Sequence, residues 1–382
     1  MKKILSIFLI LLFSIVLCAP ISSIQIKEPQ LDINVKSAVL MDANTGTILY
    51  NLNKDLQLPP ASVTKIMTLL LVFEAIENGK LKYDDVLVVS ENAASMGGSQ
   101  VYLEPGEEMC VEDLLKSVII ASANDAALTL AEHVAGSEEA FVELMNLRAA
   151  ELSMKNTHFE NVTGLDDDVI NHLTTAYDIA LMSKELIKHK KITEYSTIWM
   201  DTIRNGEFGL TNTNRLVRFY KGITGLKTGS TSKAGFCVST TAQRDGLELI
   251  AVIMGAESSD MRNACATKLL DFGFANYSIY KNAGKDLGNI KIIGGEKDVV
   301  NIKFDSFQML LNKGNEKKIS YDIVLNDSIK APINIGDEVG KINYILDNEI
   351  IGYSSVYSTE KINKISFWQY FLKLLNNYML NF

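Results

Sequence analysis

Cysteine and histidine are scarce in this sequence, which has four of each among its 382 residues. Cys18 lies in the N-terminal apolar segment, so an odd number of cysteines at irregular spacing remains beyond it. Such a set forms neither a disulfide framework nor a metal site, although one bridge between two of them stays open. No histidine occurs in a His-x-x-x-His or His-x-x-Glu pattern of a zinc peptidase. We therefore expect no metal and no cofactor, and we interpret Cys110, Cys237 and Cys265 as small buried apolar residues.

Positive charge is in the minority, because 37 Lys and Arg residues face 46 Asp and Glu residues, for a net charge of −9. The sequence has no basic stripe, no zinc-finger spacing and no glycine-rich phosphate loop, which argues against nucleic acid as a partner. Apolar residues make up 47% and charged residues 22% of the chain, a composition typical of folded globular proteins. The length predicts one large domain and a smaller one.

Residues 1–23 have the pattern of an export signal. Lys2 and Lys3 precede the apolar run Ile4–Leu17, and a stretch of small residues that suits signal peptidase follows. The alternative is a retained membrane anchor. Leu17 is too bulky for a good lipoprotein cleavage site, so we expect no lipidation at the next residue.

The stretch Pro59–Phe73 carries the most chemical information. Two prolines end a loop that leads into an apolar helix, and Gly79 can close that helix. Ser62 and Lys65 are three residues apart, so they would be neighbours on one helical face. A lysine deprotonates a serine at neutral pH only if burial and a second cation lower its pKa from about 10.4. The sequence contains four Ser-x-x-Lys matches, and this is the match that opens a long apolar helix.

Apolar periodicity and turn signals predict the elements up to about residue 278. The runs Ser37–Asp42 and Thr47–Asn51 flank a turn, which indicates a β-hairpin. We expect helices over Val111–Ile120, Ala126–Val134, Glu138–Leu152, Thr175–Lys188 and Arg262–Phe274, and strands over Phe236–Gln243 and Leu247–Gly255. This order predicts an α+β domain over residues 30–278, with an antiparallel sheet flanked by helices and an inserted helical subdomain.

The pattern changes towards the C-terminus. We expect a linker over residues 279–289 and a small all-β sandwich over residues 290–357. Its expected strands contain the runs Ile290–Ile293, Val299–Phe304, Ile319–Val324, Ile333–Ile335, Ile342–Ile345 and Ile350–Tyr353. Residues 358–382 predict an amphipathic helix whose apolar face is interrupted by Lys373 and three amides. That pattern favours a helix lying on a membrane surface over a transmembrane span, with packing onto its own domain or a second copy as the alternative.

Two further short motifs follow Ser62 along the chain. Ser122-Ala-Asn124 lies between two predicted helices, and Lys227-Thr-Gly229 lies where strands begin. Together they form the signature of serine penicillin-recognising enzymes. The chain resembles the low-molecular-mass penicillin-binding proteins, which are serine-type D-alanyl-D-alanine carboxypeptidases, over about residues 30–357. The resemblance rests on the segments Pro60–Thr68, Gly98–Tyr102, Ser122–Ala127 and Gly225–Gly235.

The resemblance implies an exported enzyme at the outer face of the cytoplasmic membrane or in the cell wall. Ser62 would attack the penultimate D-alanine of a peptidoglycan stem peptide, release the terminal D-alanine, and be acylated by β-lactams. Lys65 would accept the hydroxyl proton, and Ser122 would pass a proton to the leaving amine. Asn124 would hold the acyl-side amide.

The same resemblance implies a carboxylate site around the third motif. Lys227 would be the second cation, Thr228 would bind the terminal carboxylate, and Gly229 would let the strand approach the substrate. The backbone N–H groups of Ser62 and Ser230 would form the oxyanion hole.

Two positions near that carboxylate site are less typical. Arg262 falls where relatives place an arginine near the substrate carboxylate, and a solvated arginine at a helix start is the alternative. Ser230 stands where relatives often carry His or Thr, which leaves substrate preference and deacylation rate open. The alternatives for the whole protein are a β-lactamase, for which no Glu-x-x-Leu-Asn pattern is found around Glu160, and a penicillin-binding scaffold that no longer turns over.

Overall fold

The computed structural model describes residues 31–166, 169–326 and 328–379, and the side chains up to residue 376. The predicted export signal over residues 1–23 lies outside these ranges. The described chain divides into two compact units, which meet in sequence between Ser278 and Ile279. We call residues 27–278 the first unit and residues 279–382 the second unit.

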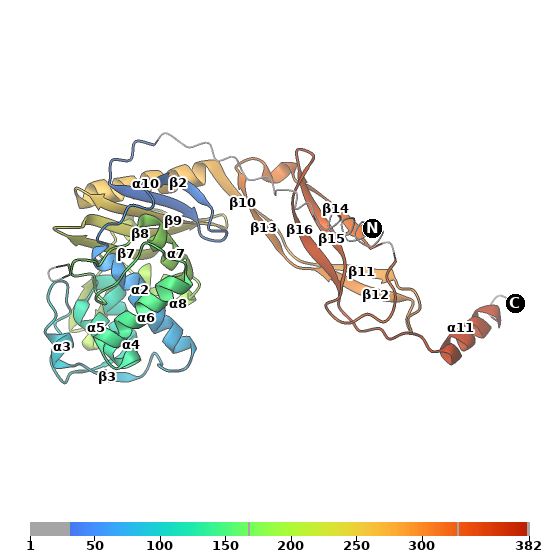
Figure 1. Ribbon diagram of the computed structural model, residues 1–382, viewed down its shortest axis with the longest axis horizontal. Coiled ribbons are helices and arrows are strands. Elements are labelled where there is room, and N and C mark those ends of the chain that lie inside the picture. Colours follow the sequence, from blue (N-terminus) through green and yellow to red (C-terminus); the bar gives the residue numbers. More distant parts are fainter. Residues whose placement is uncertain (1–30, 167–168, 327, 380–382) are drawn as a thin grey trace, which may run out of the picture. The chain divides into compact units, whose positions relative to one another are not determined.

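The first unit is built on a five-stranded antiparallel sheet in the order β2-β1-β9-β8-β7. Its strands are β1 (Ser37–Asp42), β2 (Ile48–Leu52), β7 (Ile223–Thr231), β8 (Gly235–Arg244) and β9 (Leu247–Ala256). β1 and most of β9 are buried because both lie inside the sheet and carry apolar side chains towards both faces. Helix α10 (Ser259–Asn276) covers one face, and the remaining larger helices lie on the other (Figure 1).

The helical part of the first unit lies between β2 and β7 in sequence. Its main helices are α2 (Lys65–Glu77), α4 (Val111–Lys116), α5 (Asn124–Ala135), α6 (Glu138–Glu151), α7 (Ala176–Leu186) and α8 (Lys190–Ser196). Side-chain caps begin two of them: Ser137 Oγ accepts from the backbone N–H of Ala140, and Thr175 Oγ1 from that of Asp178. A π-helical turn, η2 (Ser117–Ala121), follows α4 directly. The predicted antiparallel sheet with flanking helices and a helical insertion is confirmed.

Several short elements were not predicted. They are β3 (Val86–Val88), α3 (Glu91–Ala94), β4 (Glu108–Cys110), β5 (Met200–Ile203), η3 (Arg204–Gly206), β6 (Phe208–Thr211) and α9 (Leu216–Phe219). Each strand in this set has only three or four residues, and their side chains are largely exposed, so apolar alternation is weak. Residues 101–104, which lie between α3 and β4, form no regular element.

The second unit contains a five-stranded antiparallel sheet in the order β11-β12-β16-β15-β14 and a two-stranded sheet of β10 and β13. The larger sheet consists of β11 (Asp286–Lys291), β12 (Val299–Phe304), β14 (Ser320–Leu325), β15 (Glu338–Leu346) and β16 (Glu349–Ser358). The smaller one consists of β10 (Tyr277–Asn282) and β13 (Phe307–Asn312), and a short turn η4 (Glu316–Lys318) follows. Tyr344 is fully buried and stacks on Phe307 with ring centroids 3.9 Å apart. The predicted small β domain is confirmed.

Three boundaries in the second unit differ from the prediction. Most of the expected linker over residues 279–289 is strand, because Tyr280 packs on the aromatic core of this unit. Residues 333–335 form one isolated bridge, between Ile333 and Ile362, in place of a strand. The terminal helix α11 (Phe367–Met379) begins nine residues later than the expected 358, since the chain up to Ile365 still bonds to the β unit.

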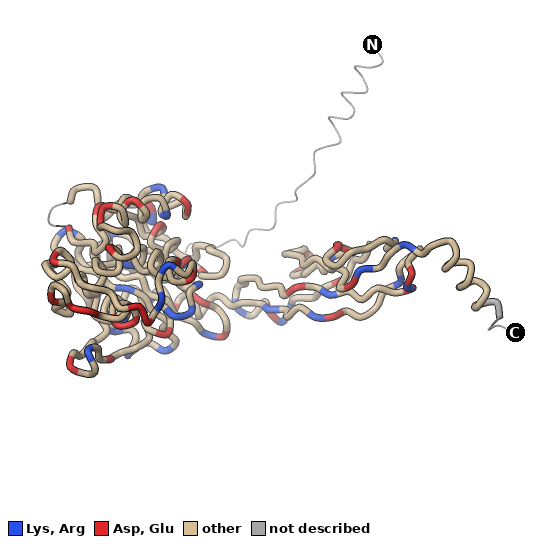
Figure 2. Tube along the Cα trace, turned by 90° about the horizontal axis from the view of Figure 1, so that it is seen from below, with Lys and Arg blue, Asp and Glu red and all other residues tan. Residues whose placement is uncertain are grey.

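Helix α11 exposes its described aromatic side chains, including Phe367 at 75% and Trp368 at 71%. It carries one lysine and is otherwise uncharged over its length, as Figure 2 shows. Lys373 forms an ion pair with Asp298 of the same unit. Among the described residues, every helix is too short or too polar to cross a bilayer. The side chains of residues 377–382, which belong to the predicted amphipathic helix, lie outside the described ones.

Candidate active site

The predicted nucleophile lies in a single turn between a proline and a buried helix. Ser62 belongs to the 3-10 turn η1 (Ala61–Thr64), which leads directly into α2. Lys65, the first residue of α2, is fully buried, and its Nζ donates to Ser62 Oγ at 3.0 Å. A second bond, also 3.0 Å, joins Lys65 Nζ to the carbonyl oxygen of Thr163. The serine and the lysine of the first motif are therefore in direct contact.

The second and third motifs meet at the same place. Lys227 Nζ donates to Ser122 Oγ at 2.8 Å and to the carbonyl oxygen of Thr228 at 2.9 Å. Ser122 follows the π-helical turn and has a left-handed backbone with a φ of 66°. Such a conformation is uncommon for a residue other than glycine, and it is held here by the surrounding chain. The turn thereby directs the hydroxyl of Ser122 back towards the sheet.

Burial and mutual repulsion lower the pKa values of the buried cations. The pKa of Lys65 lies well below its ordinary value, chiefly because the amine is buried, and in addition because Lys227 is near; Asp125 opposes the shift. Burial, with a contribution from Arg262, lowers the pKa of Lys227 to about 7. A fraction of these amines is thus uncharged near neutral pH, which is the condition for a lysine to act as a base.

Gly229 brings β7 against the nucleophile turn. A Cβ at this position would lie 2.7 Å from the backbone nitrogen of Ser62 and 2.9 Å from that of Val63. We expected the glycine to make room for a substrate. In the structure, the first atoms that a side chain would meet belong to the turn itself. Gly229 therefore allows β7 to lie directly against the backbone of the turn that carries Ser62.

Asn124 begins helix α5 beneath the loop that carries Ser99. Its backbone N–H donates to the carbonyl oxygen of Ser99 at 2.7 Å, and its Nδ2 donates to that of Gly97 at 2.6 Å. Asn124 Oδ1 is buried and has no hydrogen-bond partner among the described residues. A buried amide with an unused acceptor and one spare N–H is suited to a polar ligand group.

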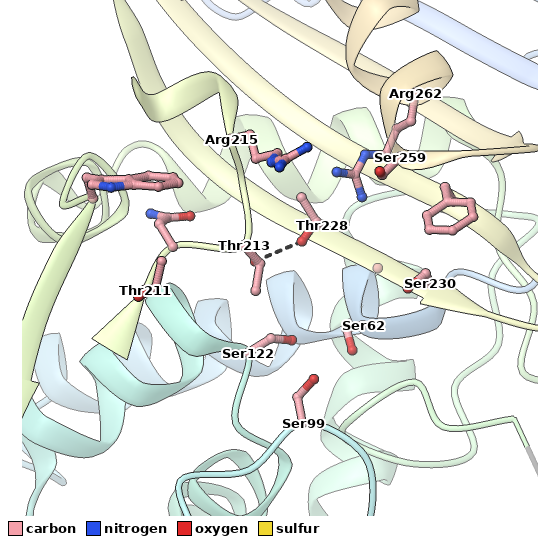
Figure 3. Close-up of a pocket in the computed structure, with 14 residues that line it drawn as sticks. Ser62, Ser99, Ser122, Thr211, Thr213, Arg215, Thr228, Ser230, Ser259 and Arg262 are labelled. Atoms are coloured by element: carbon pink, nitrogen blue, oxygen red, sulfur yellow. Dashed lines mark hydrogen bonds between the residues drawn. The ribbon is translucent and has the colours of Figure 1, made fainter. Parts of the chain in front are cut away.

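The motifs line a cavity of about 570 Å³, shown in Figure 3. Ser62, Ser122, Thr228, Gly229, Ser230 and Arg262 all contribute to its wall. Lys65 and Lys227 lie beneath that wall, and each bonds to one of the serines. The structure therefore brings all nine predicted site residues to one region, with Asn124 reaching it through the Ser99 loop.

One end of the cavity is cationic. Thr228 Oγ1 donates to Thr213 Oγ1 at 2.8 Å, and the guanidinium groups of Arg215 and Arg262 lie on the same side (Figure 3). Arg262 is only 5% exposed, and its burial, together with the neighbouring Arg215, lowers its pKa to about 10. The alternative of a solvated Arg262 is therefore wrong. Two guanidinium groups near a threonine hydroxyl suit a carboxylate.

Sequence reasoning missed several residues that line the cavity: Ser99, Trp199, Thr211, Asn212, Thr213, Arg215, Phe236 and Ser259. Ser99 lies in a segment that carried the family resemblance, so its signal was present but unassigned. Thr213 and Arg215 have no local signal, because their positions depend on how the chain enters β7. In the described part of the chain, no three His, Cys, Asp or Glu side chains converge as a metal site.

Comparisons with known proteins agree with this geometry. Residues 24–258 match the D-alanyl-D-alanine carboxypeptidase family, and residues 274–364 match the C-terminal domain of penicillin-binding protein 5. The chain is 43% identical over 340 residues to D-alanyl-D-alanine carboxypeptidase DacF of Bacillus subtilis, and this alignment covers 87% of each chain.

Solved structures give the same result. The structure of penicillin-binding protein 5 from Haemophilus influenzae superimposes with a TM-score of 0.73 at 31% identity, covering 88% of this chain and 99% of that one. Penicillin-binding protein D2 of Listeria monocytogenes, solved in its ampicillin-bound form, matches with a TM-score of 0.57 at 33% identity, over 64% of this chain and all of that one. The chain therefore belongs to the D-alanyl-D-alanine carboxypeptidase family and carries the C-terminal domain of penicillin-binding protein 5.

Proposed function

We propose that this protein is a serine D-Ala-D-Ala carboxypeptidase that removes the terminal D-alanine from peptidoglycan stem pentapeptides through an acyl-enzyme on Ser62. The observation that carries the proposal is the 3.0 Å contact between Ser62 Oγ and the buried amine of Lys65. Because the pKa of this amine is lowered by burial and by Lys227, a fraction of it is uncharged and can accept the serine proton.

Acylation begins when Ser62 Oγ attacks the carbonyl carbon of the penultimate D-alanine and passes its proton to Lys65 Nζ. The carbonyl oxygen becomes an oxyanion, which the backbone N–H groups of Ser62 and Ser230 stabilise. Gly229 supports this step, because it lets β7 lie against the turn that carries the Ser62 N–H group. The tetrahedral intermediate then collapses, and the C–N bond to the terminal D-alanine breaks.

The leaving amine takes up a proton at this point. We assign this donation to Ser122, whose hydroxyl accepts from Lys227 Nζ at 2.8 Å and faces the same cavity as Ser62. Ser122 relays to the amine the proton that Lys65 took from Ser62, so both Ser122 and Lys65 return to their starting states. The released product is free D-alanine, and the stem stays bound to Ser62 as an ester. Water then hydrolyses the ester and regenerates the serine.

The substrate is oriented by groups on either side of Ser62. Thr228, Ser230 and Arg262 form the carboxylate end together with the positive charge of Lys227, and Asn124 holds the acyl-side amide. Arg215 is an addition to the predicted set, since it lines the same end of the cavity. A terminal carboxylate is thus recognised by three cations and two hydroxyls, which favours a substrate with a free C-terminus.

β-Lactams would acylate the same serine, as inhibitors. They carry a carboxylate and a strained amide in the arrangement of the stem terminus, and a family member of Listeria monocytogenes has been solved in its ampicillin-bound form. Mass spectrometry after penicillin treatment should locate one adduct on Ser62. An adduct on another serine would contradict the assignment.

One experiment tests the reaction itself. Wild-type protein should release D-alanine from a stem pentapeptide, and Ser62→Ala should release none. Binding of penicillin without D-alanine release would point to a scaffold that no longer turns over. Rapid hydrolysis of the penicillin adduct, in place of a stoichiometric burst and slow release, would point to a β-lactamase.

We further propose that the protein is exported by residues 1–23 and docks on the outer face of the cytoplasmic membrane through α11. The exposed aromatic side chains of Phe367 and Trp368 support this placement, since such rings are favourable at a bilayer interface. A chain ending at Ser366 is the suitable test, because Ile362 is buried in the second unit and would be kept. This chain should be lost from membranes and should retain D-alanine release; continued membrane association would contradict the anchor.

A further inference from the structure

The described residues 158–166 and 169–174, which we call the bracing loop, contact the nucleophile turn through Thr163 and Gly164. The loop lies so close that Gly164, with a φ of +83°, has no room for a side chain. A Cβ there would lie 1.8 Å from the carbonyl oxygen of Ala61 and 2.7 Å from Thr64 Oγ1. The turn is thus held between Gly229 on one side and Gly164 on the other.

The bracing loop also contacts the proposed base. The carbonyl oxygen of Thr163 accepts from Lys65 Nζ at 3.0 Å. An uncharged amine has two N–H bonds and one lone pair, so a fixed acceptor for one N–H restricts where the lone pair points. With Ser62 Oγ also 3.0 Å from the nitrogen, the position of Thr163 helps to direct the lone pair at the hydroxyl proton. The distance between the bracing loop and the amine of Lys65 therefore affects proton transfer.

His172 ties the bracing loop to the residue before this lysine. Its Nδ1 accepts from the backbone N–H of Glu160 at 3.0 Å, and its Nε2 lies 2.8 Å from Thr64 Oγ1. Because a backbone N–H can only donate, Nδ1 is the acceptor in a neutral ring, and Nε2 carries the proton that Thr64 accepts. The ring is 3% exposed and packs edge-on against Phe159. His172 thus connects both ends of the bracing loop to Thr64, the last residue of the nucleophile turn.

We infer that His172 is a positioning residue for acylation. By bonding to Thr64, it holds the bracing loop at the distance from Lys65 at which the carbonyl oxygen of Thr163 orients the amine. This inference rests on the proposed function. It assigns His172 no contact with substrate, and its effect passes through hydrogen bonds that are all within the described chain.

The charge state of His172 is consistent with this role. Burial lowers the pKa of the imidazole to about 4, with Glu160 and Asp166 opposing the shift and His158 adding to it. The ring is therefore neutral at the pH of ordinary growth. Protonation would place an N–H on Nδ1, so that two donors would face each other at the backbone N–H of Glu160. The hydrogen bond from Glu160 to His172 therefore depends on the neutral ring.

Substitutions at Thr64 test the inference while His172 stays in place. Thr64→Ser keeps the hydroxyl, and Thr64→Val keeps the shape and removes it. The limiting rate constant for acylation by a penicillin should fall about 10- to 100-fold in Thr64→Val, because small misplacements of reacting groups cost that much. Thr64→Ser should stay near wild type, and the dissociation constant of the initial complex should change by less than about twofold in both. Rates are normalised to the fraction of protein that a fluorescent penicillin labels.

Two further variants separate positioning from general loosening. His172→Phe keeps a ring against Phe159 and removes both nitrogens, and combining it with Thr64→Val should add little to the slower single variant. Thr68→Val removes another buried bond between the same helix and loop, from Thr68 Oγ1 to the carbonyl oxygen of Val162, and should slow acylation far less. Wild-type acylation rates in Thr64→Val, or equal slowing by Thr68→Val, would overturn the inference. Absence of D-alanine release by wild type would instead overturn the proposed function.

Discussion

The two units of the chain differ in what they bury. The first unit buries the cations Lys65, Lys227 and Arg262 at the cavity, and it also buries the carboxylates of Asp42, Asp125, Asp166 and Asp178. In the described part of the second unit, the buried polar side chains are Asn343, Ser354 and Ser358, and none is charged. Burying an ion costs several kcal/mol even after relaxation, so the first unit bears a cost that the described part of the second unit does not. The comparison separates a unit strained for reaction from one packed for stability.

The largest test of this comparison is removal of a buried charge from the first unit. Lys65→Gln should reduce the acylation rate by about 10²–10⁴, because the base is lost while an amide of similar length remains. Stopped-flow acylation with a fluorescent penicillin measures it. Lys281→Gln is a matched control, since Lys281 also follows a serine by three residues but is exposed. Acylation near the wild-type rate in Lys65→Gln would remove the basis for calling the first unit strained for reaction.

A smaller effect on acylation is expected from Gly229, where β7 approaches the nucleophile turn closely and no charged group is involved. Gly229→Ala should slow acylation about 10²–10³-fold, because its Cβ displaces the nucleophile turn and with it an oxyanion donor. Gly209→Ala adds the same methyl group on β6, where no atom of the described residues lies within 4 Å of the new carbon, and should leave the rate unchanged. Equal rates in the two variants would contradict the role of this close approach.

The converse test is a cavity in the second unit. Ile342 is fully buried there, so Ile342→Ala should lower the free energy of unfolding of this unit by about 2–5 kcal/mol. Calorimetry should show one transition moved to lower temperature. The acylation rate of Ser62 should not change. A slower acylation in Ile342→Ala would contradict the assignment of the reaction to the first unit alone.

The pH dependence sharpens the comparison further. Lys227, whose pKa is lowered to about 7, is positively charged below that pH and neutral above it. Because its charge attracts the ligand carboxylate, the second-order acylation rate constant of the free enzyme should fall as pH rises through 7. Arg262→Gln removes the neighbouring positive charge, so the fall in the rate constant should occur at a higher pH. A profile that is flat across pH 7 would contradict the electrostatic role of Lys227.

The sequence predicts the fold best where burial is two-sided. β8 and β9 follow the apolar runs to within two residues, because strands inside a sheet carry apolar side chains on both faces. β5 and β6 escaped prediction because they are short and exposed, and β10 because Ser278 interrupts its few apolar residues and Lys281 and Asn282 follow them. The late start of α11 has the same origin, since a single buried Ile362 extends the β unit beyond its last strand.

The candidate site divides in the same way. Ser62, Lys65, Ser122 and Lys227 belong to short motifs, so local spacing identified them. Arg215 and His172 belong to no motif, because their partners are far away in sequence: His172 bonds to a residue 108 positions earlier. The reason for Gly229 also needed coordinates, since sequence shows that a glycine is there but not which atoms approach it.

The glycines that enclose the nucleophile turn limit how this protein could evolve drug resistance. A common route to resistance is a bulkier side chain that narrows the entrance to an inhibitor. A Cβ would lie 1.8 Å from the carbonyl oxygen of Ala61 at position 164 and 2.7 Å from the backbone nitrogen of Ser62 at position 229. Selection at these two codons would therefore sacrifice the natural reaction together with the antibiotic. Resistant alleles should instead concentrate on the rim, at residues such as Ser230 that face the cavity without supporting the turn.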